Sequence, residues 1–261
     1  MAIDTQTIIK LRQMTGAGMV DCKKALVAAE GDLDKAIEIL RKNGEAKAAK
    51  KAERETNEGI ITLAESDGKV AYVALKSETD FVARNEDFIA AGKELAEKLL
   101  TVSEEEFKTL AETKIKNELV VKIGENIQLG DYGVVSDKVV GAYLHSNKKV
   151  AAIVTLSAGT KDVAVDVGMQ IVAMSPEYLK PENVPAEVVD KEKEIATEQL
   201  KKEGKPAEII EKIIGGKITK YYQEACLTKQ MFIKDDKVSV EDYVKSAADG
   251  AEITSFIKIE L

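Results

Sequence analysis

The sequence is poor in residues that carry redox, metal or acid–base chemistry, with two cysteines, one histidine and no tryptophan. Cys22 and Cys226 are far apart, and neither has another cysteine or a histidine nearby. This spacing excludes a disulfide framework and a zinc site, and it predicts reduced thiols. His145 has no serine or cysteine partner that the sequence identifies, which favours a surface or binding role over catalysis. We therefore expect no metal, no cofactor and no enzymatic reaction, and recognition as the main task.

Three further absences narrow the class of protein. No stretch approaches about 18 apolar residues, and no positive region precedes an apolar run at the N-terminus, so we expect a cytoplasmic protein without membrane contact. The net charge of −8 and the pI of about 5.1 argue against a broad phosphate-binding surface and against nucleic acid as the main partner. No P-loop motif occurs, and Gly16-Ala17-Gly18 neither follows a strand nor continues as a dinucleotide-binding motif. Direct nucleotide binding is therefore not expected.

Residues 1–44 predict three short helices that together form a small docking module. Asp4 and Asp32 are the expected N-caps of the first and third helices, and the helices should end at Thr15–Gly18, Gly31 and Gly44. The second helix carries two apolar stripes, one made of Met19, Cys22, Leu26 and Ala29, the other of Val20 and Val27 beside Lys23 and Lys24. One stripe must close the bundle. The other is a candidate contact surface, with partial burial of both stripes as the alternative.

Residues 45–56 have charge and alanine but no large apolar side chain, which predicts a linker without a core of its own. A weak repeat follows. Predicted hairpins at residues 59–75 and 139–156 each lead into a helix, and Lys-Val-Ala opens the second strand of both, at 69–71 and 149–151. Chance similarity is the alternative. The repeat predicts an α+β core of two antiparallel subdomains, at 57–138 and 139–261, with a capped helix from Ser103 to about Val121 between the hairpins.

Residues 186–226 predict a projecting helical hairpin inserted in the second subdomain. Its expected arms are 186–203 and 206–226, with the tip at Gly204-Lys205-Pro206. Gly215-Gly216 is unusual inside a helix, and either close backbone approach or a local break would explain it. After the hairpin we expect a short strand at Met231–Ile233, a helix starting at Ser239 and a final strand over 252–261.

The tract Ser77–Asn85 lies at a predicted strand-to-helix corner, between a strand over 69–76 and a helix starting near Glu86. The chain has only five phenylalanines, so the presence of one of them, Phe81, in this polar corner needs an explanation. Two interpretations remain open at this point. Phe81 pushes into a partner protein, or it tucks under its own loop while Thr79 or Asp80 caps the next helix.

Two tracts resemble the signatures of one family, bacterial translation elongation factor Ts. The first is Leu11-Arg12-Gln13-Met14-Thr15-Gly16-Ala17-Gly18-Met19-Val20-Asp21-Cys22-Lys23-Lys24-Ala25-Leu26, and the second is Glu78-Thr79-Asp80-Phe81-Val82-Ala83-Arg84. The resemblance continues through 122–126 and the helical arm. It implies an α+β fold with an N-terminal three-helix (UBA-like) module, a core of two subdomains and a coiled-coil hairpin.

The resemblance also implies a function, guanine-nucleotide exchange on the GTPase elongation factor Tu, and the residues that contact it. The tract expected to disturb magnesium binding in the GTPase is Thr79, Asp80, Phe81 and Val82. The N-terminal module is expected to contact the nucleotide-binding domain through Leu11, Arg12, Met19, Val20 and Lys23. Further core contacts match Ile123, Gly124, His145 and Ile233. Many family members continue past the last strand with a short helical module, whereas this sequence ends at Leu261, so contacts of that module are expected to be absent or replaced.

A passive adaptor is the competing hypothesis: a docking module and arm that join partners without changing nucleotide affinity. A metabolic enzyme is disfavoured because the sequence offers no constellation of catalytic groups.

Overall fold

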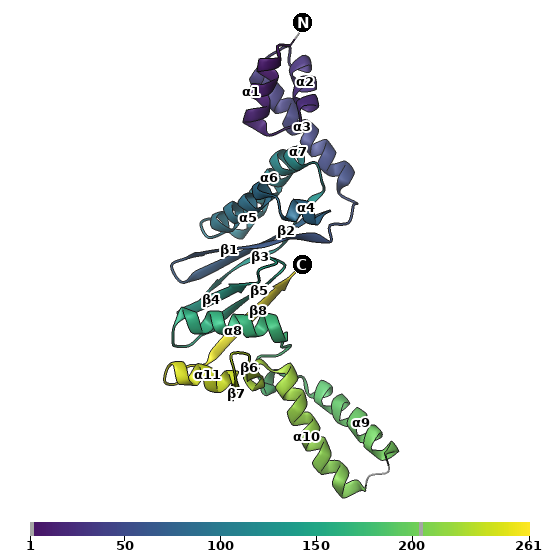
Figure 1. The fold of residues 1–261 in the computed structure, drawn as a ribbon, viewed down its shortest axis with the longest axis vertical. Coiled ribbons are helices and arrows are strands. Elements are labelled where there is room, and N and C mark those ends of the chain that lie inside the picture. The colour runs from purple at the N-terminus through teal and green to yellow at the C-terminus, as the bar shows by residue number, and fades with distance from the viewer. Residues whose placement is uncertain (1–2, 204–205) are drawn as a thin grey trace.

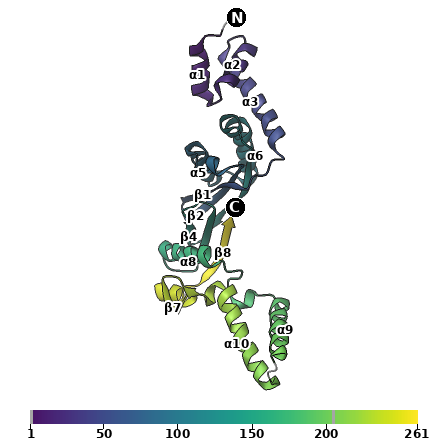
Figure 2. The same ribbon diagram turned by 45° about the vertical axis from the view of Figure 1, so that its right-hand side comes forward.

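The protein is an elongated α+β molecule with three parts in a row (Figures 1 and 2). The computed structural model describes residues 3–203 and 206–261. A three-helix module lies at one end, a core of sheets and helices lies in the middle, and a helical hairpin projects from the other end. Gly204 and Lys205, two of the three residues predicted at the tip of the hairpin, fall outside the described residues.

The N-terminal module consists of α1 (Thr5–Thr15), α2 (Met19–Ala28) and α3 (Leu33–Lys51). Asp32 caps α3 by accepting hydrogen bonds from two backbone N–H groups, whereas Asp4 makes no side-chain cap to α1. Gly16 ends α1 in the left-handed conformation, with φ at 68°. The predicted bundle of three helices is thus confirmed. Its core is formed by Ile8, Leu11, Cys22, Leu26 and Leu40, among others.

The third helix is longer than the sequence indicated, because Gly44 does not end it. A Cβ on Gly44 would lie 2.3 Å from Val121 Cγ2 and 2.8 Å from the carbonyl oxygen of Lys116. Gly44 therefore permits close packing of two helices, and α3 continues to Lys51. The prediction of a helix end there was wrong. The first part of the predicted linker is helical, and Ala48 packs against the core of the first subdomain.

The first subdomain is a three-stranded antiparallel sheet covered on one face by helices. The sheet order is β1 (Glu58–Ser66), β2 (Lys69–Ser77), β3 (Ile127–Ser136). The helices are α4 (Asp80–Ala83), α5 (Glu86–Leu99), α6 (Glu104–Lys114), the π-helix η1 (Ile115–Leu119) and α7 (Val120–Ile123). Asp67 and Gly68 form the tight β1–β2 turn with φ angles of 49° and 72°, as hairpins of this kind require. Phe88, Leu95 and Phe107 fill the space between sheet and helices.

The second subdomain repeats this plan. Its sheet order is β4 (Val139–Leu144), β5 (Val150–Leu156), β8 (Ile253–Glu260). The outer elements are α8 (Lys161–Met174), the 3-10 turns η2 (Pro181–Asn183) and η3 (Leu227–Lys229), the small hairpin β6 (Met231–Phe232) and β7 (Asp235–Ser239), and α11 (Val240–Ala247). Buried side chains join α8, α11 and the sheet, among them Leu156, Ile171 and Val244.

The two sheets face each other, which makes the core four layers deep, from helices through two sheets to helices (Figure 1). Ile61 and Val70 of the first sheet pack against Ile153 and Ile259 of the second. The backbone N–H of Ile61 also donates to the carbonyl oxygen of Lys148, at 2.7 Å. The subdomains therefore share an apolar interface, and we retain residue 138 as the proposed boundary between them.

The projecting arm is formed by α9 (Ala186–Lys202) and α10 (Ala207–Ala225). Ala196, Leu200 and Ile210 are buried along its narrow apolar seam. Gly215 and Gly216 lie within α10, where the helix is unbroken and a Cβ on either would meet nothing within 4 Å. Neither explanation offered for this pair is therefore correct, and nothing in the structure explains the two glycines.

Candidate functional site

The strand-to-helix corner at Ser77–Asn85 presents Phe81 to solvent. Thr79 caps the one-turn helix α4, and its Oγ1 accepts a hydrogen bond from the backbone N–H of Val82 at 3.4 Å. Val82 and Ala83 are buried and anchor α4 to the first subdomain, while Phe81 is 83% exposed. The interpretation in which Phe81 tucks under its loop is therefore wrong, and the predicted cap differs as well: Thr79 caps α4, whereas the helix that starts at Glu86 is capped by Asn85.

A charged hollow lies next to this corner. Asp80 forms an ion pair with Arg84 at 3.0 Å, one helical turn later. Both side chains line the hollow together with the β4–β5 turn of the second subdomain, at residues 146–149. Glu58 on β1 pairs with Lys149 of that turn at 2.6 Å. Residues from both subdomains thus border one concave surface beside Phe81.

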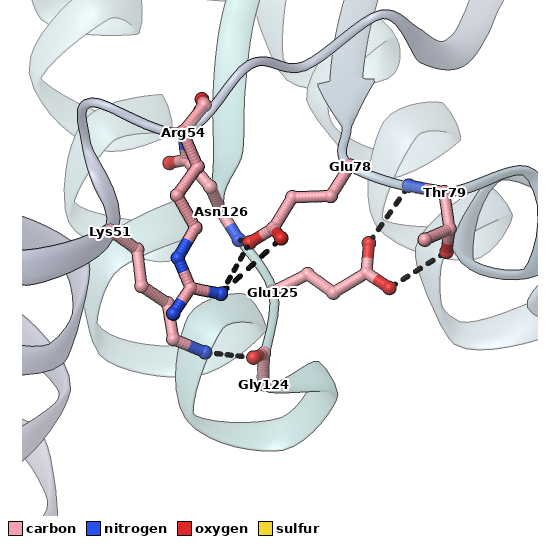
Figure 3. A network of polar contacts seen from close by, with 7 residues as sticks. All are labelled: Lys51, Arg54, Glu78, Thr79, Gly124, Glu125 and Asn126. Atoms are coloured by element: carbon pink, nitrogen blue, oxygen red, sulfur yellow. Dashed lines mark hydrogen bonds and ion pairs between the residues drawn. The ribbon is translucent and has the colours of Figure 1, made fainter.

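A polar network braces the corner from behind (Figure 3). The carboxylate of Glu125 accepts the backbone N–H of Thr79 at 3.1 Å and its hydroxyl at 2.7 Å. Glu78 accepts the backbone N–H of Asn126 at 2.6 Å and pairs with Arg54 at 3.3 Å. The hydrogen bond from Asn126, followed by the Arg54 guanidinium, lowers the pKa of Glu78 below its usual value. Glu78 is therefore held in its ionised form.

The candidate residues of the N-terminal module fall into two groups. Arg12, Met19, Val20 and Lys23 are exposed, and Val20 is 65% accessible. The second stripe of α2 is thus open to solvent, whereas Met19, assigned to the first stripe, lies at its exposed margin. Leu11 has no accessible surface, because it lies in the core of the module. Its side chain supports the surface from inside and is not available to a partner in this conformation.

The remaining candidates are spread along the molecule. Ile123 is half-buried at the end of α7, and Gly124 follows it in the left-handed conformation with φ at 86°. These two lead directly into the braced corner through Glu125. His145 is half-buried at the start of the β4–β5 turn, near the hollow. Ile233 is exposed and directly follows β6. The strand β6 lies on the outer side of the second subdomain, away from α4 (Figure 1).

The sequence alone did not identify Glu78, Glu125 and Asn126 as bracing residues, because their partners are distant along the chain. Glu78 and Asn126 are separated by 48 residues, and Thr79 and Glu125 by 46. No local pattern signals such pairs. The one available hint was that Glu125 and Asn126 end a tract with family resemblance.

The described part of the chain contains no cluster of histidine, cysteine, aspartate or glutamate that would hold a metal ion. Within residues 3–203 and 206–261, no helix has the length and apolarity needed to cross a membrane. Cys22 and Cys226 are both free and buried. Burial raises the pKa of Cys226 to about 11, which keeps this thiol protonated and unreactive.

Comparison with known proteins gives a consistent result over the whole chain. A sequence model of the family described as Elongation factor TS matches residues 78–261, which is more than half of the chain. Elongation factor Ts of Hydrogenobaculum sp. is 45% identical, with 100% of this chain and 99% of the relative covered. The proteins of the same name from Nitratiruptor sp. and Deinococcus radiodurans are 47% and 42% identical, with 93% and 98% of the relative covered. The chain belongs to the elongation factor Ts family.

Proposed function

We propose that this protein is a guanine-nucleotide exchange factor of translation elongation, acting in the cytoplasm on elongation factor Tu. The observation that carries the proposal is Phe81, a large apolar side chain held out to solvent on a braced one-turn helix. Family membership supplies the partner. An exposed aromatic on a fixed support suits insertion into an apolar pocket of another protein, because such anchors contribute much of the binding energy of an interface.

The mechanism requires no covalent chemistry by this chain. The factor binds the nucleotide-free GTPase more tightly than the GDP-bound form, and by linkage it weakens GDP binding by the same factor. Phe81 enters a pocket that opens when the nucleotide site is deformed. Thr79, Asp80 and Val82 shape the same contact, and this contact disturbs the magnesium ion of the GTPase. The exposed ion pair of Asp80 with Arg84 leaves the Asp80 carboxylate accessible for polar contacts beside the ring.

Two further surfaces are proposed to hold the partner. The exposed second stripe of α2 docks on the nucleotide-binding domain through Val20 and Lys23. Met19, at the exposed margin of the first stripe, and Arg12 of α1 add to this contact. Ile123, Gly124, His145 and Ile233 contribute along the core. These surfaces are far apart, which suits a large partner that extends from the N-terminal module to the β6–β7 hairpin (Figure 1).

Release of a fluorescent GDP analogue from elongation factor Tu tests this function. The rate is measured with and without the full chain, in the presence of excess unlabelled GDP. We expect the protein to accelerate release in a concentration-dependent manner. The adaptor alternative predicts complex formation without acceleration, so a bound complex with an unchanged release rate would refute the exchange function.

A further inference from the structure

We propose that Glu125 is a positioning residue that sets the direction of Phe81. This inference rests on the proposed exchange function, and it adds a residue from a distant loop to the machinery of the corner. Three features of the structure support it: the short length of α4, the hydrogen bonds made by Glu125, and the contacts that fix the loop carrying Glu125.

The helix α4 is too short to hold its own geometry. It has four residues, Asp80–Ala83, whereas isolated helices below about 12 residues are marginal in water. Val82 and Ala83 anchor one side of it in the core. Phe81 lies on the other side and is largely free of contact with the protein. The direction of its ring therefore depends on how firmly the start of the helix is fixed.

Glu125 fixes that start through the Thr79 hydroxyl. A hydroxyl has one proton to donate, and the Thr79 proton is directed to Glu125 at 2.7 Å. The oxygen lone pairs then face the N–H of Val82, which donates to Thr79 Oγ1. The second oxygen of the carboxylate accepts the backbone N–H of Thr79. Both hydrogen bonds end on a charged acceptor and are stronger than neutral ones.

The loop that carries Glu125 is itself held on both sides (Figure 3). On one side the Lys51 ammonium, at the end of α3, donates to the carbonyl oxygen of Gly124. On the other side the backbone N–H of Asn126 donates to Glu78, and its side-chain amide donates to the carbonyl oxygen of Arg54 at 2.8 Å. Asn126 is almost fully buried. Glu125 is thus presented to Thr79 from a fixed base.

Exchange assays on variants of the full chain test this role. Loss of the brace should leave α4 in the productive orientation for a fraction of the time, and the maximal exchange rate at saturating factor should fall by about tenfold if that fraction is about a tenth. The concentration of factor for half-maximal exchange should change far less, because the other contacts remain. We expect Glu125→Ala to show this pattern, and Glu125→Gln to recover part of the rate, since its amide oxygen still accepts one hydrogen bond. Glu112→Ala, which removes an exposed carboxylate of α6 paired with Lys116, is the matched control and should match wild type.

A double mutant separates positioning from a general structural effect. If Glu125 acts through Phe81, then Glu125→Ala combined with Phe81→Ala should exchange no more slowly than Phe81→Ala alone. An additive loss in the double mutant would overturn the proposal. An unchanged maximal rate in Glu125→Ala, with active wild type, would overturn it as well. Inactive wild type would instead refute the exchange function on which it rests.

Two measurements keep the inference testable should Glu125→Ala fold poorly. Thr79→Ser keeps the hydroxyl that donates to Glu125, whereas the isosteric Thr79→Val removes it. We expect the valine variant to show a lower maximal rate than the serine variant, because only the serine variant can still donate to Glu125; equal rates in the two variants would contradict the proposal. Hydrogen exchange provides a readout without any partner. The amide of Val82 should exchange faster in Glu125→Gln than in wild type, and unchanged protection would count against the brace.

Discussion

Replacement of Phe81 by alanine should slow nucleotide exchange while leaving the free protein intact. The side chain is 83% exposed, so its removal costs the isolated fold within about 0.5 kcal/mol, as for other surface substitutions. Full burial of a phenylalanine contributes about 1.5–3 kcal/mol, and nearly all of that is still available for a partner. If the ring is buried in the transition state for GDP release, the exchange rate should fall by about tenfold to 150-fold.

Binding should suffer less than exchange. In the complex, part of the energy from burying the ring maintains the deformed nucleotide site of the partner. Without the ring that deformation relaxes, and the remaining interface still holds. The assay pairs stopped-flow release of fluorescent GDP with the dissociation constant for nucleotide-free elongation factor Tu. Val134→Ala, an exposed apolar residue on β3, is the control and should change neither quantity. Equal losses in exchange and binding would refute the wedge role of Phe81.

Three other predictions concern packing, charge and pH. Gly44→Ala should destabilise the protein by about 1–3 kcal/mol through overpacking against α7 and η1, whereas Gly215→Ala, with open space around it, should stabilise α10 by about 0.4–1 kcal/mol; urea unfolding measures both, and equal effects would contradict the packing argument. Lys23→Glu should mainly lower the association rate with the partner, with a smaller effect at high salt; an on-rate equal to wild type would exclude steering by α2. Glu78 has a folded-state pKa below the unfolded value of 4.5, so its contribution to stability is complete above about pH 4.5 and is lost as pH falls through the depressed pKa. Unfolding free energies of Glu78→Gln should therefore fall less steeply with acid than those of wild type, and parallel curves would contradict this.

Features with a local physical cause were predictable from the sequence. The Asp67-Gly68 turn needs two residues that tolerate positive φ, and the cap at Ser103 needs a hydroxyl before a helix, so both were visible in the chain. Repetition of such signals gave the two hairpins and the helix that follows each one. The corner at Thr79–Val82 was also identifiable as a candidate site, because Phe81 stands beside Asp80 between a predicted strand and a predicted helix, although the exposure of its ring was left open.

Features that depend on distant contacts were not predictable in this way. β3 went unrecognised because it contains Gly130 and Gly133 and lacks a clear alternation of apolar and polar residues. Both glycines allow close approach of β2, with Tyr72 and Ala74 beside them. Gly44 was taken for a helix end because its actual partner, Val121, is far along the chain.

The packing at Gly44 and the brace at Glu125 both help to join the N-terminal module to the corner that carries Phe81. The helix α3 leaves the module, packs closely on the η1–α7 segment and ends at Lys51 beside the loop of Glu125 (Figures 1 and 3). The side chain of Lys122 also covers Gly16 of the module and pairs with Asp87 at 2.8 Å. We expect the exposed stripe of α2 and the Phe81 corner to approach a partner as one unit.

The most direct test of the exchange function is the rate of GDP release from elongation factor Tu as the concentration of this protein is raised. We expect a rate that rises toward a plateau well above spontaneous release, with the Phe81→Ala plateau clearly below that of wild type. A release rate that stays at the spontaneous value while the two proteins form a complex would contradict the exchange function.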